Sequence, residues 1–64
     1  MPLYEKYATI RDEKGVTDYW VAKETGIATA TLSSWKQGIY TPKLDKIVLI
    51  ANALGVPLEA LLEC

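Results

Sequence analysis

The segment TGIATATLSSWKQG, which runs from Thr25 to Gly38, differs in composition from the rest of this 64-residue chain. It contains five hydroxyl residues and no acidic residue, and Lys36 is its only charged residue. Glycines near its start and at its end bound a stretch of helical length, because glycine often lies just outside a helix terminus. What this segment does depends on which of its side chains face the solvent.

Residues 28–37 separate into two faces when they are placed on a helical wheel at about 100° per residue. The inward face carries Leu32, Trp35 and Ala28. The outward face carries Ala30, Ser33, Ser34 and Gln37. Thr29 lies at the exposed N-terminal end, and Thr31 lies on the flank of the core.

An outward face that is small, polar and free of acids suits a helix that enters the major groove of DNA. Large side chains would block its approach, and acidic side chains would be repelled by the phosphates. The alternative is an ordinary solvated face, but such faces usually carry Glu and Lys rather than Ser, Thr and Ala. The segment therefore predicts a DNA recognition helix.

The residues just before this helix have the spacing of a helix-turn-helix motif, at about residues 18–37. Ala22 and Gly26 are four positions apart, and Gly26-Ile27-Ala28 is a three-residue turn. A small residue at Ala22 allows the second helix to cross closely over the first, and Gly26 can adopt a left-handed backbone conformation.

Glycines and prolines divide the whole chain into five pieces of helical length. The expected helices cover residues 3–14, 18–24, 29–37, the stretch from Pro42 to Gly55, and the residues after Pro57. Thr17 is a suitable N-cap for the second helix, whereas either Ala28 or Thr29 could cap the third. On the fourth helix the residues expected to face inward are Leu44, Ile47, Val48, Ala51 and Leu54.

Composition and charge narrow the possible functions. The length allows one domain, residues 1–64, and half of the residues are apolar, which is enough for a small core. The chain has no histidine and one cysteine, Cys64, so a Ser-His-Asp triad or a cysteine metal cluster is excluded. We expect no enzyme activity, cofactor, metal or small-molecule ligand.

No secretion signal or membrane span is evident, and we expect a cytoplasmic protein. The net charge is −1, but residues 27–50 carry +2.

The stretches IRDEKGVTDYWVAKETGIATATLSSWKQG and TPKLDKIVLIANALGVPLEALL resemble the DNA-binding domain of the lambdoid phage repressor and Cro family, also called the xenobiotic-response-element type. The resemblance covers nearly all of residues 3–62. It implies a compact all-α fold of five short helices and sequence-specific binding of double-stranded DNA by a phage-type transcriptional repressor, with residues 29–37 in the major groove.

The resemblance also implies roles for individual residues. The base-reading positions correspond to Thr29, Ala30 and Ser34, which lie with Ser33 on the exposed side of the recognition helix. The phosphate-contacting positions correspond to Thr17, Asp18, Gln37, Lys43 and Lys46. The end of the domain usually forms a two-fold contact, which here implies a weak homodimer through Leu58, Leu61 and Leu62 on an operator with two half-sites.

Three positions depart from the family pattern. Asp18 is an anion where a phosphate should approach. Lys36 stands where the family often has a glutamate that pairs with Arg11. Lys36 is thereby released for a phosphate contact, and Arg11 pairs elsewhere, with Asp45 as one candidate, or stays solvated. Trp20 replaces a polar residue, and either packs against a neighbouring helix or marks a partner contact.

A second function from another class is a protein-interaction module, antitoxin-like or regulatory, in which DNA binding is secondary. The acidic net charge and Trp20 favour this function. The acid-free recognition helix and the local positive charge favour DNA.

Overall fold

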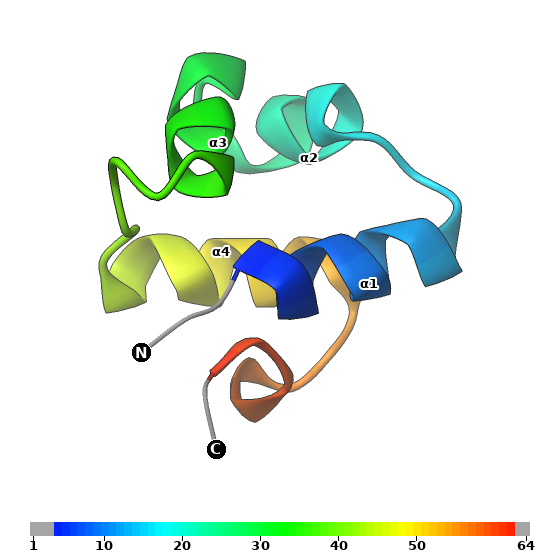
Figure 1. Ribbon diagram of the computed structural model, residues 1–64. Coiled ribbons are helices and arrows are strands. Elements are labelled where there is room, and N and C mark those ends of the chain that lie inside the picture. The colour runs from blue at the N-terminus through cyan, green and yellow to red at the C-terminus, as the bar shows by residue number, and fades with distance from the viewer. Residues whose placement is uncertain (1–3, 63–64) are drawn as a thin grey trace.

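The computed structural model describes residues 4–62 and is all-helical over that range (Figure 1). The α-helices are α1 (Tyr4–Lys14), α2 (Asp18–Thr25), α3 (Thr29–Lys36) and α4 (Leu44–Leu54), and a 3-10 helix, η1 (Leu58–Leu61), follows. These elements confirm the predicted fold class and the predicted order of helices. The last predicted helix is a single 3-10 turn, and Leu3, the predicted start of the first helix, lies outside the described residues.

The helices form two levels around one core. In Figure 1, α2 and α3 lie above α1 and α4, and η1 lies below them. α4 packs against α2 on one side and against η1 on the other, and α1 contacts α3, α4 and η1. The described chain measures 24 × 23 × 19 Å along its principal axes. This arrangement leaves the upper side of α3 free of any covering helix.

The core takes its buried side chains from every helix. They are Tyr7, Val21, Ile27, Leu32, Trp35, Ile47, Ile50, Ala51, Leu54 and Leu61. An aromatic cluster joins α1 to α3: the Trp35 ring lies 5.2 Å from the Tyr7 ring and 5.4 Å from the Tyr4 ring, centroid to centroid. The inward positions predicted for Leu32 and Trp35 are confirmed, with 0% and 4% of their surface exposed.

Two residues of α4 that were predicted to face inward do not. Leu44 is 60% exposed and Val48 is 37% exposed, whereas Ile50, which the prediction omitted, is fully buried. The buried stripe is Ile47, Ile50, Ala51 and Leu54, which has the i, i+3, i+4, i+7 spacing of one helix face. Val48 lies about 100° from Ile47 on this helix, outside that stripe. Leu44 begins the helix, a full turn before Ile47.

Ala28 is a further correction, because it is exposed rather than buried. It is the N-cap of α3 and has an extended backbone, with φ −65° and ψ 144°. The wheel used for the prediction assumes helical geometry, which Ala28 does not have. Ala28 rather than Thr29 therefore occupies the N-cap position of α3. No side chain donates or accepts a capping hydrogen bond at this end of the helix.

Candidate nucleic-acid interface

The turn between α2 and α3 is held by local hydrogen bonds. Gly26 ends α2 with φ 78°, and its N–H donates to the carbonyl oxygen of Ala22 at 2.8 Å. The Thr25 hydroxyl donates to the Val21 carbonyl at 2.7 Å and accepts from the N–H of Ile27 at 3.2 Å. Ile27 is 7% exposed, so its side chain anchors the turn in the core. These contacts define the direction in which α3 leaves α2.

The outer side of α3 carries the residues predicted to read bases. Thr29, Ala30 and Ser33 are exposed, and Ser34 is half-buried. The helix contains no acidic residue, since its sequence is TATLSSWK. Because Leu32 and Trp35 are buried, the side chains that project from the outer surface before Lys36 are short. The structure thus brings all four predicted base-reading residues to one exposed side of one helix.

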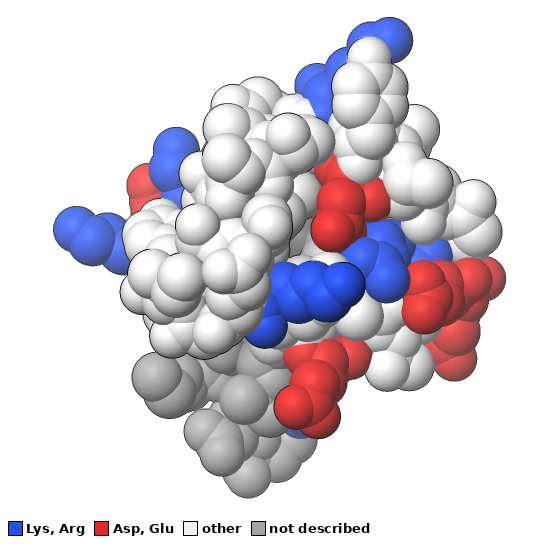
Figure 2. All heavy atoms as spheres, turned by 45° about the horizontal axis from the view of Figure 1, so that its top comes forward, with Lys and Arg blue, Asp and Glu red and all other residues white. Residues whose placement is uncertain are grey.

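Exposed lysines lie on the segments next to this surface. Lys36 ends α3, Lys43 is the N-cap of α4, and Lys46 lies in the first turn of α4, and all three are exposed. Gln37, the C-cap of α3, is also exposed. Figure 2 views the molecule with the α2 and α3 side turned forward, and a broad area of that surface shows neither acidic nor basic side chains. The three lysines therefore belong to the end of α3 and the start of α4, and the rest of α3 carries no charged residue.

Asp18, predicted to approach a phosphate, is held inside a network of hydrogen bonds instead. Its Oδ1 accepts from the Tyr7 hydroxyl and from Arg11 Nη1, both at 2.7 Å, and its Oδ2 accepts from the Tyr4 hydroxyl at 3.3 Å. Arg11 Nη1 also donates to the Tyr4 hydroxyl at 3.0 Å. Both carboxylate oxygens are engaged, so Asp18 joins α2 to α1.

The same network corrects the prediction for Arg11. Arg11 forms ion pairs with Asp18 at 2.7 Å and with Asp12 at 3.0 Å, and Asp45 is not its partner. Its side chain is only 19% exposed. Sequence reasoning missed this arrangement, although Tyr4, Tyr7 and Arg11 are spaced at i, i+3 and i+7 along one helix face.

A family model described as helix-turn-helix matches residues 8–61. The chain belongs to this family. The match agrees with the predicted resemblance to the lambda repressor and Cro type, and the helix-turn-helix family consists of DNA-binding domains of transcription regulators. Neither a curated protein nor a solved structure matches the chain. None of the helices in residues 4–62 has the length and apolarity that crossing a membrane requires.

The charges of this network stabilise the contact between α2, the first helix of the helix-turn-helix motif, and α1. Burial alone would raise the pKa of Asp18, but hydrogen bonds from Tyr7 and Arg11 outweigh it, so the pKa of Asp18 is lowered. Burial and the hydrogen bond to Asp18 raise the pKa of the Tyr7 hydroxyl well above its ordinary value. The hydrogen bond to Asp18 raises the pKa of Arg11. Asp18 is therefore charged at neutral pH, and its donors keep their protons.

The remaining predicted residues of the helix-turn-helix have mixed outcomes. Thr17 is confirmed as the N-cap of α2, since its side-chain oxygen accepts from the N–H of Trp20 at 3.1 Å. Trp20 is half-buried and packs against the core, as the packing alternative predicts. Tyr19, the neighbour of Trp20 on α2, is 70% exposed.

At the C-terminal end, Leu61 differs from the other two leucines of the predicted dimer contact. Leu61 is fully buried in the core of its own chain, whereas Leu58 and Leu62 are half-buried. The Lys6 ammonium group donates to the Leu62 carbonyl at 2.7 Å and so ties this end of the chain to α1. Leu61 therefore has no surface to offer a second chain.

Tyr40 is a further residue at this surface, and the sequence analysis gave it no role. It lies in the loop after α3 and is 38% exposed. The N–H groups of Ile39 and Tyr40 both point to the Ser34 carbonyl, at 3.0 and 3.4 Å, so the loop folds back against the end of α3. Gly38, with φ 78°, was the sequence signal for this reversal of the chain.

Proposed function

We propose that this helix-turn-helix domain is a sequence-specific repressor of the phage type, which inserts α3 into the major groove of double-stranded DNA. The observation that carries the proposal is the outer side of α3, which is exposed, small and free of acids. Thr29, Ala30, Ser33 and Ser34 face the base edges. A helix of this kind fits the width of the major groove without steric obstruction.

The proposed phosphate contacts lie at the start of α2, at the end of α3 and at the start of α4. They are Thr17, Lys36, Gln37, Lys43 and Lys46, all of them exposed. Asp18 is left out of this set because its carboxylate is engaged by Tyr4, Tyr7 and Arg11. Phosphate contacts position a protein on the duplex and supply affinity, but they carry little sequence information.

We expect base discrimination to be modest. Thr29, Ala30, Ser33 and Ser34 cannot form the bidentate pairs that arginine forms with guanine or glutamine with adenine, each worth roughly 1–3 kcal/mol. The Thr29 and Ala30 methyl groups suit contact with the methyl group of thymine, and a serine hydroxyl can bond to either kind of base edge. Part of the specificity then comes from the shape of the DNA.

Substitutions at Ser34 and Lys43 separate the two kinds of contact. In selection from a random duplex library, Ser34→Ala changes the selected sequence, because it removes a hydroxyl from the base-reading side. Lys43→Ala weakens binding to all sequences about equally and reduces the salt slope of a dimer by roughly 2, at about 0.9 per lost phosphate contact. Repeating the binding titration at several salt concentrations measures this slope.

Two results would contradict these roles in different ways. If Lys43→Ala shifts the selected sequence while Ser34→Ala lowers affinity uniformly, the assignment of residues is wrong. If the parent protein selects no sequence at low salt, DNA binding itself fails as the function.

We further expect a weak homodimer on DNA, with recognition helices about 34 Å apart. Leu58 and Leu62 are the half-buried apolar residues of the C-terminal end that remain for a two-fold contact, with Leu61 beneath them in the core. Sedimentation of the protein with a duplex of two half-sites should show two chains per duplex. Strict one-to-one binding on such DNA would rule out the dimer.

The second candidate function, a protein-interaction module, is favoured by one observation. Ile39 is 76% exposed, Leu44 is 60% exposed and Leu49 is 42% exposed, although all three are large and apolar. Large apolar side chains on the surface can belong to protein-protein contacts. This function takes the place of the first if the parent protein selects no DNA sequence at low salt.

A further inference from the structure

A hollow of about 340 Å³ opens on the groove side of α3. It is lined by Ala30, Thr31 and Ser34 of the recognition helix and by Tyr40 of the loop that follows. Ala30 and Ser34 belong to the proposed base-reading set, whereas Tyr40 does not. The hollow therefore lies partly on the surface that would meet the bases.

The position of Tyr40 is determined by the loop backbone. Gly38 reverses the chain with φ 78°, and its N–H donates to the Trp35 carbonyl at 3.1 Å. The backbone N–H groups of Ile39 and Tyr40 then bond to the Ser34 carbonyl. Pro42, two residues later, is buried and anchors the other end of the loop. The backbone is thus fixed both before and after Tyr40, which keeps Tyr40 beside α3.

The lining of the hollow has a distinct chemistry. Ala30 and the Tyr40 ring offer apolar surface, while the Ser34 and Thr31 hydroxyl groups can donate or accept a hydrogen bond. No cation or anion lines it, which disfavours a phosphate as its occupant. A group with an apolar part next to a hydrogen-bond acceptor would satisfy this lining.

Thymine presents such a group in the major groove, because its 5-methyl group stands next to the O4 acceptor. We propose that this hollow takes the 5-methyl group of a thymine and that Tyr40 determines specificity for it. The Tyr40 ring covers the methyl group, Ala30 contacts it from the helix, and the Ser34 hydroxyl donates to O4. This inference rests on the proposed function, since it requires α3 in the major groove.

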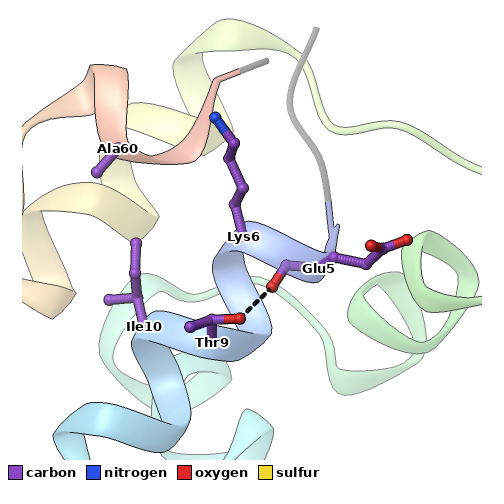
Figure 3. Close-up of a pocket in the computed structure, with 5 residues that line it drawn as sticks. All are labelled: Glu5, Lys6, Thr9, Ile10 and Ala60. Carbon is purple, nitrogen blue, oxygen red and sulfur yellow. Dashed lines mark hydrogen bonds between the residues drawn. The ribbon is translucent and has the colours of Figure 1, made fainter. Parts of the chain in front are cut away.

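A second hollow in the described chain is different in kind. It has a volume of about 370 Å³ and is lined by Glu5, Lys6, Thr9, Ile10 and Ala60, from α1 and η1 (Figure 3). The Thr9 hydroxyl donates to the Glu5 carbonyl, and Lys6 donates to the Leu62 carbonyl. The Thr9 hydroxyl and the Lys6 ammonium group are therefore engaged within the chain, and none of the lining residues belongs to α3.

The test compares thymine with uracil, which lacks the 5-methyl group. A duplex selected by the parent protein is prepared with deoxyuridine in place of each thymine in turn. At one position, the parent should bind thymine about fourfold more tightly, which is the effect of burying one methyl group at roughly 0.8 kcal/mol. Tyr40→Ala should bind the two duplexes equally at that position, with an unchanged salt slope.

Two variants serve as controls. Tyr40→Phe keeps the aromatic ring and should keep the preference for thymine. Tyr19→Ala removes an equally large side chain from an exposed site on α2 and should also keep it. Circular dichroism verifies that Tyr40→Ala is folded, which is expected because Tyr40 is not part of the core.

Each failure has a separate meaning. If the parent selects a sequence but discriminates thymine from uracil no better than Tyr40→Ala does, the role of Tyr40 is refuted and the proposed function stands. The same holds if the parent tolerates uracil at every position. If the parent selects no sequence at all, the proposed function fails and the role of Tyr40 fails with it.

Discussion

Trp35→Ala should lower the free energy of unfolding by about 3–5 kcal/mol. Trp35 is 4% exposed, and its ring packs against the rings of Tyr4 and Tyr7, so the substitution removes the contact between α3 and α1. Small domains have a total stability at the low end of roughly 5–15 kcal/mol. The variant should therefore be largely unfolded at moderate temperature. Urea unfolding followed by circular dichroism measures the change.

Tyr19→Ala is the matched control for this prediction. Tyr19 is also aromatic but is 70% exposed, so its removal should change the free energy of unfolding by less than about 0.5 kcal/mol. A Trp35→Ala variant that unfolds at the same urea concentration as the parent would mean that Trp35 does not belong to the core.

Asp18→Ala should be the second most damaging substitution, at about 2–3 kcal/mol. It removes the acceptor of the Tyr7 hydroxyl and of the Arg11 guanidinium, and both donors lie in partly buried surroundings. The cost arises mainly from leaving these donors without a partner. The same urea unfolding experiment measures it, with Asp12→Ala as a control, because Asp12 is 70% exposed.

The Asp18 network also makes stability depend on pH in the acid range. The pKa of Asp18 is lower in the folded chain than its ordinary value of 3.8, which describes the unfolded chain. Its contribution is therefore fully present above that value and is lost as the pH falls through the lower, folded pKa. Asp18→Asn should flatten this part of the stability profile. An acid profile identical to that of the parent would show that Asp18 contributes nothing to it.

The fold was largely predictable because its signals are local. Gly26 and Gly55 end helices where the sequence indicated, both with positive φ, and Thr17 begins α2 as a side-chain cap. The two faces of α3 were predictable for the same reason, since Leu32 and Trp35 are the only large apolar residues in it. Such features depend on residues a few positions apart, which a single sequence contains.

Several features that the sequence did not predict depend on how the segments pack. The partners of Asp18 lie on α1, and only the crossing of α1 and α2 brings them together. The position of Tyr40 depends on how the loop closes onto Ser34, which the hydroxyl pattern of α3 does not reveal. The exposure of Leu44 depends on where the packed part of α4 begins. Each of these needs tertiary geometry that periodicity alone does not supply.

The cluster of Tyr4, Tyr7 and Trp35 gives the domain an optical signal of its own. Aromatic rings held at defined mutual angles absorb left and right circularly polarised light differently in the near ultraviolet, and this signal disappears when tertiary packing loosens while the helices remain. The Tyr4 and Trp35 rings are held at an interplanar angle of 88°. Because Trp35 belongs to α3 and the tyrosines to α1, the contribution of these three rings to the near-ultraviolet spectrum reports how α3 packs on α1 without any added label.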